Sequence, residues 1–113
     1  MTALLEKICK ILSSKKAEDI ICIDISKKTS IADYFVIASG KNITHIRTLG
    51  EFLIEKLEKE DIRPLRNEGL REGQWGVIDY GDIIVHIFDQ KTRSLYKLDK
   101  LWESGNNLTK YED

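Results

Sequence analysis

The chain has 113 residues, of which 42% are hydrophobic and 33% are charged, and its formal net charge is −1. This length fits one domain of ordinary size, and the hydrophobic content supports a real core, which argues against a disordered chain. A near-neutral charge excludes wholesale coating of nucleic acid, which needs a basic footprint, but it leaves open an RNA-rich assembly contacted through its proteins.

The N-terminal segment and the cysteines indicate a cytosolic setting. Glu6 and Lys7 interrupt the first ten residues, so no apolar core of a signal peptide is expected there. No apolar run approaches the roughly 20 residues that span a membrane. Cys9 and Cys22 lack CxxC spacing and have apolar neighbours, which favours two buried, reduced thiols. With no N-terminal extension that would serve as a transit peptide, a bacterial cytoplasm is expected rather than an organelle.

The first half of the chain predicts two helices and two strands. Apolar residues recur at helical spacing over about residues 3–15. Residues 19–25 (DIICIDI) and 34–39 (YFVIAS) predict strands, the first with isoleucines on both faces, so that both faces of the sheet are expected to be covered. A glycine ends the second strand, and Asn42 or a neighbour can cap a long helix over about residues 42–60.

The second half predicts an extended segment, a hairpin and a helix. Pro64 makes residues 62–65 extended. Two apolar runs, residues 75–78 and 83–88, flank the turn Asp79-Tyr80-Gly81-Asp82 and predict a β-hairpin. One short amphipathic helix is expected from about Lys91, with helical spacing at Ser94, Leu95, Leu98, Leu101 and Trp102.

The order α-β-β-α-β-β-β-α predicts a single α/β domain with a mixed β-sheet flanked by helices. Residues 1–104 are expected to form this domain. Gly105-Asn106-Asn107 ends the ordered part, so residues 105–113 are expected to be a flexible C-terminal tail.

The hairpin is acidic and aromatic. From Glu72 to Gln90 the chain has no Lys or Arg, and its acids are Glu72, Asp79, Asp82 and Asp89. Aromatic residues beside carboxylates at a strand edge are typical of a surface that meets a basic partner. Core and contact roles both stay open for Trp75, and contact is favoured for Tyr80. Tyr96 and Trp102, on the last helix, are expected in the core.

Catalytic alternatives have weaker support. Residues 39–42 (SGKN) join a strand to a helix N-terminus, where anions bind, but they lack the first glycine and the Ser or Thr of a phosphate loop. Asp79 and Asp82 would need a third acid to hold magnesium, and Asp24 is the one candidate. A tight turn and a shaped hairpin are the favoured interpretations.

The histidines and cysteines predict no catalytic or metal centre. His86 would share a strand face with Ile84 and Phe88, which favours a hydrogen-bonded core residue over a general base. His45 begins a helix and is expected to be exposed. Two histidines and two scattered cysteines lack the spacing of a zinc site, and no GxSxG elbow is present. No cofactor is expected.

Several motifs, in order and at this spacing, together resemble the ribosomal silencing factor family, also called Iojap. They cover nearly the whole chain, from about Leu4 to Trp102. The motifs are TSIADYFVIASG at 29–40, the isolated His45, Glu68-Gly69, W-x-x-I-D-Y-G-D-I-I-V-H-I-F at 75–88 and R-x-x-Y-x-L-x-x-L-W at 93–102.

This resemblance implies a nucleotidyltransferase-like α/β fold without established enzymatic activity. Family members bind the large ribosomal subunit through its fourteenth ribosomal protein, a basic protein at the subunit interface. There they block joining of the small subunit and lower translation when nutrients are short. The resemblance also implies little direct contact with nucleic acid, no membrane and a homodimer when free. Organellar relatives have roles in maturation of the large subunit.

Carried over by position, the resemblance implies a partner-binding face. Its residues would be Trp75, Asp79, Tyr80 and Asp82, with Glu68 and His86 nearby. Nucleotidyltransferases need a Gly-Ser turn followed by paired acids on the next strand, whereas here Lys41 follows Gly40 and no such pair is present. A steric repressor is therefore the expected function. The alternatives are a large-subunit assembly factor and a magnesium-dependent, nucleotidyltransferase-like enzyme that uses Asp79, Asp82 and Asp24.

Overall fold

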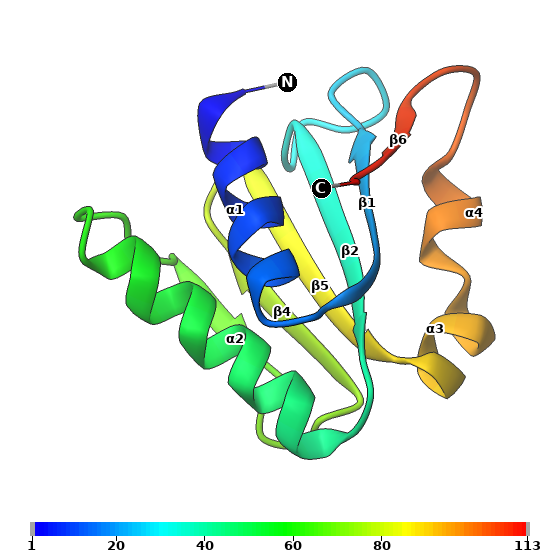
Figure 1. Ribbon diagram of the computed structural model, residues 1–113. Helices are drawn as coiled ribbons and strands as arrows, with labels where there is room; N and C mark the ends of the chain where they lie inside the picture. Colours follow the sequence, from blue (N-terminus) through cyan, green and yellow to red (C-terminus); the bar gives the residue numbers. More distant parts are fainter. Residues whose placement is uncertain (1, 113) are drawn as a thin grey trace.

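The computed structural model describes residues 2–112 and arranges them in three layers. Helices α1 and α2 cover one face of a six-stranded sheet, and α3 and α4 pack on part of the other (Figure 1). The elements in chain order are α1 (Ala3–Ser14), β1 (Glu18–Asp24), β2 (Tyr34–Gly40), α2 (Ile43–Glu58), β3 (Arg66–Glu68), β4 (Trp75–Asp79), β5 (Ile83–Asp89), α3 (Gln90–Tyr96), α4 (Leu98–Trp102) and β6 (Leu108–Lys110).

The sheet is mixed, as the sequence predicts. Its strand order is β3-β4-β5-β2-β1-β6. The central strands β2 and β5 pair in parallel, and the other neighbours pair antiparallel. Both central strands are buried along nearly their whole length, because α1 and α2 cover one face and the side chains of Trp75, Leu98 and Trp102 pack on the other. The α/β class is thus confirmed, whereas the likeness to nucleotidyltransferases stays a prediction.

The two long helices begin at side-chain caps and bury one apolar face each. The Thr2 hydroxyl accepts from the Leu5 N–H at 3.1 Å, and the Asn42 side chain accepts from the His45 N–H at 2.8 Å. Such caps satisfy backbone donors that have no partner inside the helix. In α2, a Cβ on Gly50 would lie 2.4 Å from Leu70, so a larger residue would displace that side chain.

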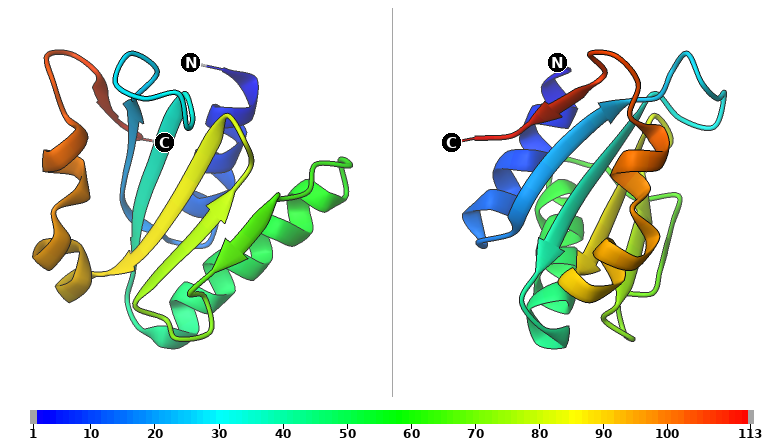
Figure 2. Two further views of the ribbon diagram at one scale, coloured as in Figure 1. Left: turned by 180° about the vertical axis from the view of Figure 1, so that it is seen from behind. Right: turned by 90° about the vertical axis from the view of Figure 1, so that its right-hand side faces the viewer.

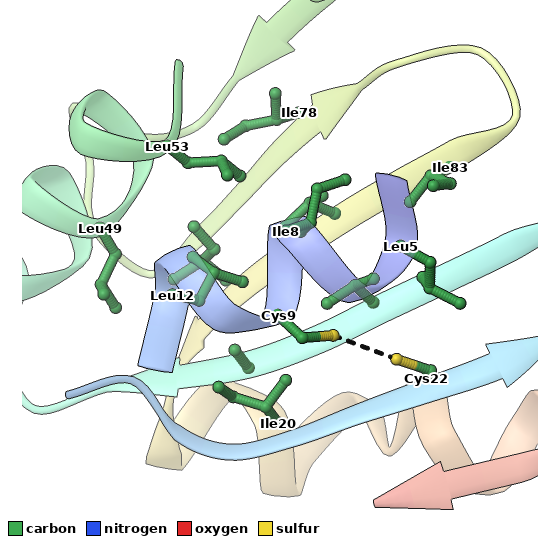
Figure 3. Packing of buried hydrophobic residues seen from close by; sticks show 14 of the residues in the cluster. Leu5, Ile8, Cys9, Leu12, Ile20, Cys22, Leu49, Leu53, Ile78 and Ile83 are labelled. Atoms are coloured by element: carbon green, nitrogen blue, oxygen red, sulfur yellow. Dashed lines mark hydrogen bonds between the residues drawn. The ribbon is translucent and has the colours of Figure 1, made fainter. Parts of the chain in front are cut away.

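The main core lies between α1, α2 and the sheet. Leucines and isoleucines of both helices meet Ile78 of β4 and Ile83 of β5 (Figure 3). Cys9 of α1 and Cys22 of β1 are both buried and free, with their sulfur atoms 3.2 Å apart. This arrangement confirms the expected buried thiols.

The C-terminal segment differs from the expected tail. Residues 108–110 form β6, which pairs antiparallel with β1 and extends the sheet by one strand. The single helix expected from Lys91 is two helices, because Lys97 takes a left-handed backbone conformation with φ of 49° and ends α3. The third strand is also shifted, from the expected residues 62–65 to β3.

No helix within residues 2–112 combines the length and apolar character that crossing a membrane requires.

Candidate functional site

One face of the sheet is only partly covered. Seen from behind, β5, β4 and β3 have no helix in front of them, since α3 and α4 lie to one side (Figure 2, left). Residues opposite each other in neighbouring strands share a face of the sheet. The register pairs Val77 with His86 and with Glu68, and Asp79 with Arg66. We call this surface the open sheet face; its residues are Arg66, Glu68, Trp75, Val77, Asp79 and His86.

Trp75 and His86 are joined across the strands. The indole N–H of Trp75 donates to Nδ1 of His86 at 3.1 Å, and the Trp75 ring stacks on Phe88 with centroids 4.8 Å apart. Nδ1 must therefore be unprotonated, which places the proton of the neutral ring on Nε2. Burial lowers the pKa of His86 to about 4, so the ring stays neutral near neutral pH. His86 is a buried structural residue, as the strand pattern predicts, and it positions Trp75.

Trp75 is half-buried, so it contributes to the core, and its contact role stays a prediction. Through Phe88, its inner side packs on a second cluster of buried apolar residues, separate from the main core. Its ring also lies 5.0 Å from that of Tyr96 on α3.

Tyr96 is exposed, and its expected place in the core is wrong. It is 56% exposed, and its neighbour Leu95 is 73% exposed. Helix α3 ends at Lys97 without a buried residue, and Leu98 and Trp102 of α4 are the side chains that pack, partly buried, against the core. Sequence reasoning missed this exposed pair because helical spacing alone does not show which apolar residues face the sheet. The R-x-x-Y part of the motif at residues 93–102 is the sequence signal that points to Tyr96.

Carboxylates border the open sheet face. Asp79 Oδ1 accepts from the Gly81 N–H at 2.8 Å, and its Oδ2 lies 3.5 Å from Nε of Arg66, so this side chain shapes the turn. Glu68 and Asp82 are exposed, and neither carboxylate has an ion-pair partner within residues 2–112. Glu68 of β3 and Asp82 of the hairpin turn are thus carboxylates that no cation of the described residues compensates.

Tyr80 is not grouped with the other predicted contact residues. It packs on the main core, which is the side of α1 and α2. Its hydroxyl is buried without a hydrogen-bond partner in the described part of the chain, and burial raises its pKa to about 12. A contact role for Tyr80 stays a prediction.

The acids proposed for magnesium are not brought together. Strand β1, with Asp24, is separated from β4, with Asp79, by two strands, which corresponds to about 14 Å. The Asp24 carboxylate accepts from the N–H and the hydroxyl of Ser26, and these bonds hold its pKa below the ordinary value. Within residues 2–112, no three His, Cys, Asp or Glu side chains are placed to hold a metal ion.

Fold and site together define a small α/β binding domain whose distinctive site is a surface. A pocket of about 700 Å³ between β1, α4 and β6 is lined by none of the predicted site residues. A family model described as "Ribosomal silencing factor during starvation" matches residues 1–113, and the chain belongs to this family. The family regulates translation through association with the large ribosomal subunit.

Similar proteins agree with this assignment. "Ribosomal silencing factor RsfS" of Bacillus subtilis is 34% identical over 88 residues, which cover 78% of this chain and 75% of that protein. "Mitochondrial assembly of ribosomal large subunit protein 1" of Mus musculus is 28% identical over 101 residues, covering 87% of this chain and 44% of that protein. A crystal structure of a Chromobacterium violaceum protein superposes with a TM-score of 0.84 at 26% identity, covering 95% of this chain and 92% of that one.

Proposed function

We propose that this chain is a translational repressor without enzymatic activity. It binds the large ribosomal subunit through the fourteenth ribosomal protein of that subunit and sterically blocks joining of the small subunit. The observation that carries the proposal is the aromatic pair Trp75–Tyr96 at the margin of an acid-bordered, uncovered sheet face.

The physical character of this face suits a basic protein partner. The exposed Tyr96 and Leu95, beside the half-buried Trp75, offer apolar area of the kind that forms the centre of protein interfaces. Free carboxylates at Glu68 and Asp82 would steer a basic partner and fix its register. A specific interface buries about 800 Å² per partner, which a domain with extents of 34 × 33 × 27 Å can supply from one face.

A steric mechanism requires no catalytic residues, in accord with the separation of Asp24 from Asp79. We further propose a cytoplasmic location and a homodimer when the protein is free. Size-exclusion chromatography with light scattering tests the oligomeric state, and a monomer at all concentrations would contradict it.

A large-subunit assembly factor is the second candidate, and one observation favours it: the mouse relative is named for assembly of the mitochondrial large subunit. The two functions differ in the particle that is bound. Binding to immature large particles but not to mature ones would favour assembly.

Co-sedimentation with purified large subunits tests the proposed surface. We expect Tyr96→Ala and Leu95→Ser to weaken binding about tenfold each, because exposed anchors lose buried area without loss of stability. Matched controls are Ile31→Ser and Ile43→Ser, which remove exposed apolar side chains, 69% and 50% exposed, outside the open sheet face. Equal co-sedimentation of all four variants would place the interface elsewhere.

A further inference from the structure

The opposite side of the molecule carries a concentration of lysines. Helices α1 and α2 lie side by side there (Figure 1). Two adjoining grooves run along their seam, and six lysines line them. We call these residues the lysine track: Lys7, Lys10, Lys15, Lys16, Lys41 and Lys56.

The charge of the track is nearly uncompensated. Glu60 is the one carboxylate among the described residues that line the two grooves, and Lys7 pairs with it. The other five lysines are exposed and have no ion-pair partner within residues 2–112. The two grooves are therefore positive, although the net charge of the chain is −1 and α2 carries Glu51, Glu55 and Glu58 outside them.

Two of the lysine side chains contact one aromatic ring, and a histidine bonds to the backbone at two others. The ammonium groups of Lys15 and Lys56 lie 4.5 Å and 5.4 Å from the centroid of the Phe52 ring. Cation–π attraction of this kind fixes both side chains over the seam. His45 joins the ends of the two helices, since its Nδ1 accepts from the Lys41 N–H at 2.9 Å and its Nε2–H donates to the Lys15 carbonyl at 2.8 Å.

This geometry selects among anionic partners. A folded acidic protein binds tightly through apolar anchors that enter pockets, but here the Phe52 ring is already occupied by two ammonium groups. Residues 7–14 of α1 rise about 10 Å along the helix axis, and Lys15 and Lys16 follow directly after the helix. A row of cations of this length suits a chain of evenly spaced anions, such as a phosphodiester backbone.

We propose that the lysine track binds the sugar–phosphate backbone of RNA without sequence preference. The inference rests on the proposed function, which places the RNA on the ribosome. It adds a second contact, on the face opposite the open sheet face. It also changes the expectation of little direct contact with nucleic acid that the family resemblance implies.

Fluorescence anisotropy of a short labelled oligouridylate, titrated with the full chain at several salt concentrations, tests the track. We expect the triple variant Lys10→Glu, Lys15→Glu, Lys56→Glu to bind at least about tenfold more weakly near 50 mM salt. For single strands log K falls with log salt by about 0.7 per contacted phosphate, so loss of three contacts should flatten the slope by about 2.

The matched control changes the net charge equally on another surface, with Lys27→Glu, Lys28→Glu and Lys91→Glu. These lysines are exposed and lie outside the track. Equal weakening in both triple variants, or no binding by the parent near 50 mM salt, would overturn the proposal. Polyglutamate that competes as well as RNA of equal charge would overturn the assignment to RNA and indicate an acidic protein segment.

These experiments test the open sheet face and the lysine track independently, because the oligonucleotide assay contains no ribosome. Tyr96→Ala, which probes the open sheet face, should bind oligouridylate as the parent does. If Tyr96→Ala abolishes co-sedimentation while the lysine variant keeps oligouridylate binding, the sheet face is supported and the track is rejected.

Discussion

At the scale of single residues, His86 connects the core to the candidate surface. Its Nδ1 accepts from Trp75, and its ring meets Phe35 edge-on with centroids 4.6 Å apart. Strand alternation predicts that His86 shares a face with Ile84 and Phe88, and the structure confirms it. Its bond to Trp75 was not predictable, because the register of β4 against β5 depends on turn geometry that alternation does not set.

The pKa of His86 makes stability depend on pH. Burial lowers it from 6.5 to about 4. Below pH 6.5 the unfolded chain takes up a proton that the folded chain does not take up until about pH 4, so the free energy of unfolding falls as pH drops through this window. The expected loss between about pH 7 and about pH 5 is about 2 kcal/mol.

Urea unfolding of the parent and of His86→Gln at both pH values measures this loss. Glutamine does not titrate and its amide oxygen can still accept from the Trp75 indole, so the variant should lose about 2 kcal/mol less than the parent on acidification. Carboxylates titrate in both proteins and cancel in the comparison. An equal loss in the two proteins would show that His86 is not kept neutral by burial.

At the scale of elements, β6 is the addition that sequence patterns did not predict. Residues 108–110 (LTK) are too short and too polar for an alternation signal, as is usual for edge strands. Asn107 holds this segment in place. Its side-chain N–H groups donate to the carbonyls of Asp24 and Trp102, both at 3.0 Å, and its Oδ1 accepts from the Ser104 N–H at 2.7 Å. The longer strands and helices were predictable because their apolar periods extend over many residues.

Asn107→Ala should lower the free energy of unfolding by about 2 kcal/mol, because three hydrogen bonds, one of them part-buried, are lost together. The adjacent Asn106→Ala is the matched control, since the Asn106 side chain is exposed and makes no hydrogen bond within residues 2–112. Chemical denaturation compares them. If both variants unfold like the parent, residues 105–110 contribute no stability, and the expected flexible tail is the better description.

At the scale of the whole molecule, the two faces of the sheet have different characters. One is aromatic with an acidic border, and the helices that cover the other carry the lysine track. The sequence predicts the acidic hairpin because its acids lie within one short segment that has no Lys or Arg. The lysine track comes from residues 7 to 56, which only the packing of α1 on α2 brings together. Coupling between faces is expected to be small, since distant sites act additively.

The number of large subunits blocked per protein molecule distinguishes a steric repressor from a magnesium-dependent enzyme. Each bound molecule withholds one large subunit, so the blocked fraction follows occupancy by mass action. With one molecule for about ten large subunits, at concentrations well above the dissociation constant, about a tenth of the subunits should fail to join small subunits. Sucrose-gradient profiles measure that fraction over time.

An enzyme would turn over, so its blocked fraction would keep growing at this ratio or would require a nucleotide. Either result would contradict the steric mechanism and would make Asp79 and Asp82 candidates for magnesium ligands again. A constant fraction that Tyr96→Ala abolishes and Ile31→Ser preserves would tie the block to the open sheet face.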